Sequence, residues 1–139
     1  MRKIASFLIL ILILSSCSKR ISYSQINERQ LEKNVQTFIQ SVTDENGIYL
    51  FIDQNTLYVY VNGSNVNFGE HSLIFTDFDV QSNDDTLNIL FNEEKTSDYT
   101  DKSLNRTLLY KVDLYKDYEH IKAYKNGEEV SFGVISGSL

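Results

Sequence analysis

The chain has 139 residues, and its 19 acidic and 13 basic residues give a net charge of −6. Nucleic-acid binding needs Lys and Arg clustered on one face, so an acidic excess scattered along the chain argues against a nucleic-acid partner. The length predicts one domain, and the single cysteine, Cys17, excludes a disulfide framework, so the core alone must hold the fold together.

The N-terminal segment carries the most specific pattern in the chain. Arg2 and Lys3 precede an apolar run from Ile4 to Leu14, which is followed by Ser15-Ser16-Cys17. The run covers 11 positions, whereas a helix that spans a bilayer needs about 20 apolar residues. The segment therefore resembles the signal peptide and lipobox, Leu14-Ser15-Ser16-Cys17, of a bacterial lipoprotein precursor.

This resemblance implies a lipid anchor on Cys17. A signal peptide over residues 1–16 is then cleaved between Ser16 and Cys17, and Cys17 carries a diacylglycerol group and often an additional acyl chain. Two acyl chains suffice for stable attachment to a bilayer. Residues 17–23 become a short tether, and the protein is held at the cell membrane or the outer membrane, outside the cytoplasm. Cleavage removes two basic residues and no acid, which takes the net charge to −8. An ordinary signal peptide or an uncleaved anchor is the alternative.

Residues Ser24 to Val42 are predicted to form an amphipathic helix. Ser24 is a plausible N-cap and Asn46-Gly47 a plausible stop. Apolar residues recur at spacings of three and four, which places them on one stripe that packs on a sheet: Leu31, Val35, Phe38, Ile39 and Val42.

The segments Ile48–Ile52 and Leu57–Val61 are predicted to form a β-hairpin, because β-branched and aromatic residues dominate both. A loop of two or four residues places all the aliphatic residues on one face. The other face then carries two aromatic cross-strand pairs: Tyr49 opposite Tyr60, and Phe51 opposite Tyr58.

In later segments apolar and polar residues alternate more regularly, which predicts strands with one face exposed to solvent. These segments are residues 73–80, 87–92 and 108–114. A last hairpin is predicted around the type I′ turn signal Asn126-Gly127, with Ala123 opposite Val130. Residues 93–105 are polar and are predicted to form a long mobile loop.

Together these elements predict an α+β fold in a single domain over residues 24–139. The amphipathic helix packs on an antiparallel, mostly meandering β-sheet of six or seven strands, which is similar to the cystatin-like arrangement. A small β-sandwich or barrel with a covering helix is the alternative.

No catalytic constellation stands out in the sequence. It lacks a nucleophile elbow, a glycine-rich phosphate loop and the H-E-x-x-H motif, and the anchor uses Cys17. His71 and His120 have no spacing that suggests a metal site. The acid pair Asp77 and Asp79 lacks the glycine and glutamate of a calcium loop. We therefore expect no enzyme activity, no catalytic residue, no cofactor and no metal.

The aromatic face of the first hairpin has two interpretations. Either the helix covers it, or it stays exposed and offers flat contact area to a protein, peptide or sugar. The second interpretation makes a candidate binding face of four residues: Tyr49, Phe51, Tyr58 and Tyr60.

The leading functional hypothesis is a non-catalytic, membrane-anchored lipoprotein that binds a protein or glycan partner in the cell envelope. One alternative is an inhibitor or immunity-type protein whose acidic surface blocks a cationic enzyme. Another is a small hydrolase of envelope polymers that uses carboxylates near Asp77, Asp79 and Glu93.

Overall fold

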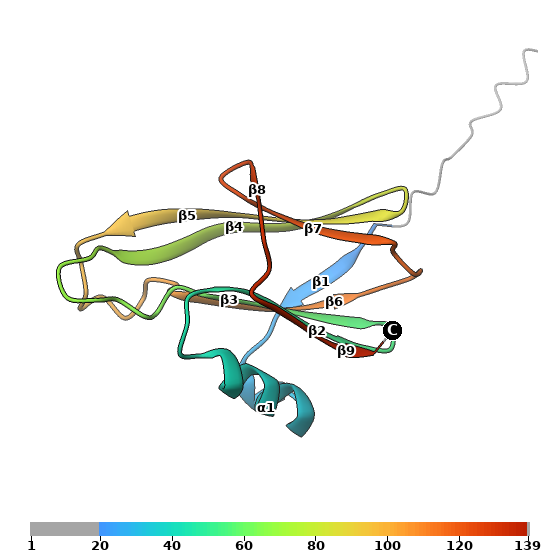
Figure 1. Cartoon of the computed structure of the whole chain (residues 1–139), viewed down its shortest axis with the longest axis horizontal. Coiled ribbons are helices and arrows are strands. Elements are labelled where there is room, and N and C mark those ends of the chain that lie inside the picture. Colours follow the sequence, from blue (N-terminus) through green and yellow to red (C-terminus); the bar gives the residue numbers. More distant parts are fainter. Residues whose placement is uncertain (1–19, 139) are drawn as a thin grey trace, which may run out of the picture.

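The fold has three layers: a helix, a five-stranded sheet and a four-stranded sheet (Figure 1). The computed structural model describes residues 20–138. The strand order is β1-β6-β3-β2-β9 in the larger sheet and β4-β5-β7-β8 in the smaller one. The elements are β1 (Ser22–Gln25), a 3-10 turn η1 (Glu28–Gln30), α1 (Lys33–Val42), β2 (Gly47–Asp53), β3 (Thr56–Asn62), β4 (Ser72–Asn83), β5 (Thr86–Thr96), β6 (Thr107–Asp113), β7 (His120–Lys125), β8 (Glu128–Val130) and β9 (Val134–Ser138).

The α+β class and the helix packed on an antiparallel sheet are confirmed. The strands are divided between two sheets, as in the sandwich alternative, instead of forming a single meander. Two pairings are parallel, β2 with β9 and β5 with β7. The chain leaves β5 for β6 of the other sheet before it returns to β7, and it crosses again from β8 to β9 (Figure 1). The reason for two sheets lies in the first hairpin, because a strand pair with two apolar faces must be covered on both sides.

The β2–β3 hairpin has the predicted register. Asp53 pairs with Thr56 across a two-residue loop, which places Leu50 opposite Val59 on the aliphatic face. That face packs against the four-stranded sheet, where Leu87 and Ile89 are fully buried, as are Leu50 and Val59. The aromatic face packs against α1. The hairpin is therefore the middle of the three layers.

The helix is shorter than predicted and begins later. α1 begins at Lys33 after the N-cap Glu32 and ends at Val42. Ser24 is not a helix cap, because it lies in β1 and pairs with Lys111 of β6. The free edge of β6 offers backbone partners to this segment, and the Tyr23 side chain packs into the core between the sheets. The predicted tether accordingly ends earlier, since Ser22 already belongs to β1.

The prediction of one loop over residues 93–105 is wrong. β5 continues to Thr96, so that Glu93 pairs with Phe75 and Lys95 with Leu73. Residues 97–106 are organised by Arg106, whose guanidinium donates hydrogen bonds to the backbone oxygens of Asp98 and Asp101 and to the Ser72 hydroxyl. A strand and an ordered connection therefore replace the predicted loop.

The predicted Asn126-Gly127 turn is confirmed. Both residues have positive φ, +52° and +81°, as a type I′ turn requires. Ala123 pairs with Val130, also as predicted, and β8 ends at Val130.

The sandwich has two distinct ends, and the strand registers define them. β1 begins at Ser22, which pairs with Asp113 at the end of β6. We call this end the tether end; it includes residues 20–22, 53–56, 83–86 and 113–120. The opposite end, called the far end, includes residues 43–47, 63–72 and 97–106 (Figure 1).

The predicted signal peptide, its cleavage site at Ser16 and Cys17, and the lipidation of Cys17 all lie outside the described residues. Within residues 20–138, no helix is both long enough and apolar enough to cross a membrane.

Candidate functional site

The aromatic face of the first hairpin is core and not a binding face. Tyr49 and Tyr60 are 4 % and 5 % exposed, and their stacked rings lie 6.2 Å apart under α1. Phe51 and Tyr58 are partly buried against the same cluster, with the Phe51 ring 5.3 Å from that of Phe38 on the helix. The exposed interpretation is therefore wrong, because the apolar stripe of α1 covers these rings.

Electrostatics agree with this placement. Burial raises the pKa of Tyr49, Tyr58 and Tyr60, since each phenolate would lose its hydration. The Tyr49 hydroxyl donates a hydrogen bond of 2.9 Å to the backbone oxygen of Glu45. The Tyr49 hydroxyl thus has its partner within the fold, and the buried Tyr49 and Tyr60 rings offer no surface to a ligand.

The carboxylates of the hydrolase hypothesis do not form one site. Asp77 accepts a hydrogen bond from Asn92, whereas Asp79 accepts one from the Tyr23 hydroxyl at 2.7 Å, between the sheets. Hydrogen bonds from Gln81 and Tyr23 lower the pKa of Asp79. Glu93 has different partners again, Lys125 and Asn126. Each acid thus has its own structural partner.

The histidines do not come together either. His71 precedes β4 at the far end, and His120 opens β7 at the tether end; both are exposed. Within residues 20–138, no group of three or more His, Cys, Asp and Glu side chains is placed to hold a metal ion.

A cleft between the two sheets is the best-formed candidate site. Its volume is about 220 Å³, and Asn46 and Gly47 of the far end contribute to its lining. Phe75 and Phe91 form part of its apolar floor, with their rings edge to face at 5.8 Å. The remaining lining comes from both sheets and from the connection before β2: Asn46, Gly47, Ile48, Val61, Asn62, Leu73, Glu93, Lys125, Val130 and Ser131.

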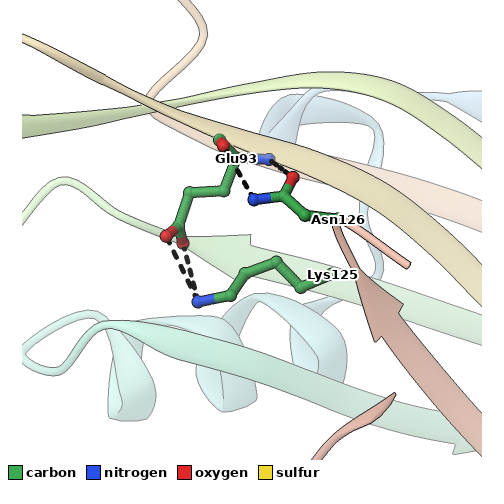
Figure 2. A network of polar contacts seen from close by, with 3 residues as sticks. All are labelled: Glu93, Lys125 and Asn126. Atoms are coloured by element: carbon green, nitrogen blue, oxygen red, sulfur yellow. Dashed lines mark hydrogen bonds and ion pairs between the residues drawn. The ribbon is translucent and has the colours of Figure 1, made fainter. Parts of the chain in front are cut away.

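An ion pair at the wall of this cleft gives it a polar centre (Figure 2). The Lys125 ammonium lies 3.2 Å and 3.3 Å from the two carboxylate oxygens of Glu93. The Glu93 side chain is 16 % exposed and that of Lys125 is 37 % exposed, so Lys125 is the more accessible side chain of the pair.

Asn126 fixes the backbone that carries Glu93. Its side-chain oxygen accepts a hydrogen bond of 2.8 Å from the Glu93 backbone N–H, and its side-chain amide donates one of 3.1 Å to the Glu93 backbone oxygen (Figure 2). The type I′ turn between β7 and β8 thus positions the carboxylate on the neighbouring strand. An apolar floor with a positioned carboxylate and a partly exposed lysine side chain is suited to binding.

A second hollow of about 330 Å³ adjoins the cleft, and the two share Asn46 and Leu73. It adds polar side chains from the far-end connections and from β5: Asn65, Glu70, His71 and Lys95. The two hollows together form a continuous surface at the far end.

The buried Asn62 side chain holds together the connections beside the cleft. It is 1 % exposed, and its amide donates hydrogen bonds of 2.9 Å to the backbone oxygens of Thr43 and Glu45. Its side-chain oxygen accepts hydrogen bonds from the Ser64 backbone N–H and hydroxyl. The Asn62 side chain thus joins two connections beside the cleft.

Comparisons with known proteins give no relative: no family model, curated protein or solved structure matches this chain.

Proposed function

We propose that the protein is a lipid-anchored, non-catalytic binding domain of the bacterial cell envelope. Cys17 carries the anchor, and the far end, with its cleft, meets the partner. The observation that carries the proposal is the placement of the cleft at the end opposite to β1, the strand that follows the tether.

Chain length supports this orientation. The five residues from Cys17 to Ser22 reach at most about 17 Å. β4 alone has 12 residues and spans about 40 Å along the sandwich. The anchor therefore keeps the tether end next to the bilayer and leaves the far end free to face a partner.

The lining of the cleft supports binding over hydrolysis. Glycoside hydrolysis needs two carboxyl groups on either side of the bond that breaks. Glu93 is the one carboxylate among the described residues that line the cleft, and it is paired with Lys125. The acids of the inhibitor alternative include a group at the tether end, which the proposed anchor would turn towards the bilayer: Asp53, Asp84, Asp85, Asp113, Asp117 and Glu119.

The proposed membrane attachment is tested by fractionating cells that express the full chain, with Cys17→Ser as the matched variant. We expect the wild type in the membrane fraction, with a mass that fits a lipidated N-terminal Cys17. The variant should leave that fraction or keep residues 1–16. A wild-type protein without lipid on Cys17 would overturn the anchored part of the proposal.

The non-catalytic part is tested by incubating the purified protein with isolated cell-wall polymer. We expect no release of soluble fragments. Release that is lost in Glu93→Gln would contradict the proposal and would place a catalytic carboxylate in the cleft.

A further inference from the structure

The two long sides of the sandwich differ in how the core between the sheets is closed. On one side the edge strands are β1 and β4, and the Tyr23 hydroxyl of β1 donates a hydrogen bond of 2.7 Å to Asp79 of β4. The Tyr23 ring also packs edge-on against Phe78 and Tyr110, which stack on each other at 3.7 Å. Aromatic side chains therefore close the core on this side.

The other side, where β8 and β9 are the edge strands, leaves part of the core uncovered. Ile135 of β9 pairs with Leu50, whose side chain is fully buried on the aliphatic face of the first hairpin. Paired residues of neighbouring strands place their side chains on the same face of a sheet. Ile135 therefore belongs to the face between the sheets, yet its side chain is 54 % exposed.

The shortness of β8 accounts for this gap. β8 ends at Val130, which pairs with Ala123, so no described strand lies beside Ile121 on that edge of β7. A hollow of about 590 Å³ opens here beside the connection from β8 to β9 (Figure 1), and we call it the side hollow. Its apolar lining consists of Ile121, Val130, Phe132 and Ile135. The side hollow shares Val130 and Ser131 with the cleft.

The edge of β9 is also open to strand pairing. An edge strand presents a row of unpaired backbone N–H and C=O groups, and sheets protect such edges by short length, charges or bulges. Among the described edge strands, β4 has a bulge after Thr76, β8 has three residues of which two are glutamates, and β1 has four mostly polar residues. β9 (Val134–Ser138) is uncharged, and its Val134 and Ile135 are 44 % and 54 % exposed.

We propose that this side of the sandwich receives an extended segment of another protein, which pairs with β9 as an added strand and inserts an apolar side chain into the side hollow. The backbone row of a strand edge is matched along its length by another strand. Every second side chain of the added strand then faces the side hollow. An acyl chain could fill the hollow but has no group to pair with the backbone of β9.

The segment that precedes β1 does not reach this site. β1 and β9 lie at opposite edges of the five-stranded sheet, four strand spacings apart, which is about 19 Å. The five residues from Cys17 to Ser22 reach at most about 17 Å. The tether of the anchored protein therefore cannot cover β9.

A second copy of the chain fits the edge but not the proposed anchor. Two copies of one strand pair about a two-fold axis, which makes them antiparallel. β9 runs from the far end towards the tether end, because Val134 pairs with Tyr49 and Ser138 with Asp53. Such a pair would set the tether end of one copy beside the far end of the other, so both anchors could not enter one bilayer. For this step the inference rests on the proposed function.

The experiment selects random twelve-residue peptides, displayed on phage, for binding to the purified full chain. We expect the selected peptides to carry apolar residues at alternate positions. Ile135→Asp should weaken the affinity of such a peptide by about tenfold or more. Phe68→Ser removes an exposed apolar side chain far from β9 and is the control, which should leave the affinity unchanged. Thermal midpoints verify that the variants fold, and Ile135→Ser replaces Ile135→Asp if the latter does not.

Hydrogen exchange of the complex tests whether the peptide pairs as a strand. The bound peptide should slow amide exchange in residues 134–138 and leave exchange at the free edge of β4 unchanged. Selected peptides that tolerate both Ile135 variants, or that bind without slowing exchange in β9, overturn the inference. So does a chain without added peptide that sediments as a dimer and already protects β9.

Failure of this inference is separable from failure of the proposed function. A peptide whose binding is lost in Lys125→Gln but kept in Ile135→Asp would overturn the strand addition and leave the proposed role of the cleft in place.

Discussion

Two groups of aromatic residues in this molecule have opposite environments. The hairpin pair Tyr49 and Tyr60 is almost completely buried between α1 and the five-stranded sheet, whereas Phe68 and Tyr99 at the far end are exposed. The hairpin rings stand in a continuous run of apolar residues, while Phe68 is isolated among Asn, Gly and Glu. A dense aromatic run in this chain thus forms strands that are covered on both faces, whereas a single aromatic residue in a turn stays exposed.

The largest effect is expected from substitutions in the buried aromatic group. Changing Tyr49→Ser and Tyr60→Ser together removes two rings from the core and should cost several kcal/mol. The thermal midpoint of the domain should fall by more than about 10 °C, as measured by circular dichroism. A fall of only a few degrees would mean that α1 does not cover this face.

A smaller effect is expected from substituting Arg106, which holds the connection that carries the exposed Tyr99. Arg106→Ala removes three hydrogen bonds, to Ser72, Asp98 and Asp101. The unfolding free energy from urea titration should fall by about 2 kcal/mol, and amide exchange over residues 97–105 should accelerate. Lys102→Ala, an exposed base in the same connection, is the control and should change neither quantity.

A third aromatic residue, Tyr23, lies between the two extremes and gives a pH-dependent effect. Its hydroxyl donates to Asp79, and this bond, after that from Gln81, lowers the pKa of Asp79 below its ordinary value of 3.8. A depressed carboxyl pKa contributes stability that is present above the unfolded-state value and is lost as the pH falls through the folded-state value.

Tyr23→Phe should therefore be less stable than wild type by roughly 1 kcal/mol at pH 7. The difference should shrink as the pH falls below about 4. Chemical denaturation at pH 7, 5 and 3 measures it, with Tyr124→Phe as the control. A difference that is independent of pH would contradict the role given to Asp79.

The smallest effect on stability is expected from substituting the exposed Phe68. Phe68→Ser changes a side chain without intramolecular burial, so the unfolding free energy should stay within about 0.5 kcal/mol of wild type. The same urea titration measures it. A clear loss of stability would show that Phe68 packs within the fold, against the exposure found for its side chain.

Local sequence patterns correctly predicted the features of the fold that depend on neighbouring residues alone, such as a hairpin register and a turn. The register of β2 with β3 follows from the placement of aliphatic and aromatic residues, and the Asn126-Gly127 turn follows from its need for two positive φ values. β1 was missed because its four residues form a strand only when β6 offers an edge to pair with. The division into two sheets was predicted only as an alternative, since it depends on the β5–β7 and β8–β9 crossings.

The candidate site was harder to predict than the fold. The cleft joins Glu93 to Lys125 and Asn126, which are more than 30 positions apart in the chain. Residues 93–96 look polar and loop-like, although Glu93 and Lys95 pair with Phe75 and Leu73 in β4. The dense aromatic pattern of the first hairpin instead led the prediction to rings that lie in the core.

The central claim is that the far end faces away from the membrane, and a quenching experiment tests it most directly. Single cysteines replace Asn55 at the tether end or Lys102 at the far end, both exposed. The lipidated protein is reconstituted into vesicles and labelled with an impermeant thiol-reactive fluorophore, which the alkylated (thioether) sulfur of Cys17 cannot take up. Lipids with a headgroup quencher should quench the probe at position 55 strongly and the probe at position 102 little. Equal quenching at both positions, or stronger quenching at position 102, would contradict the account.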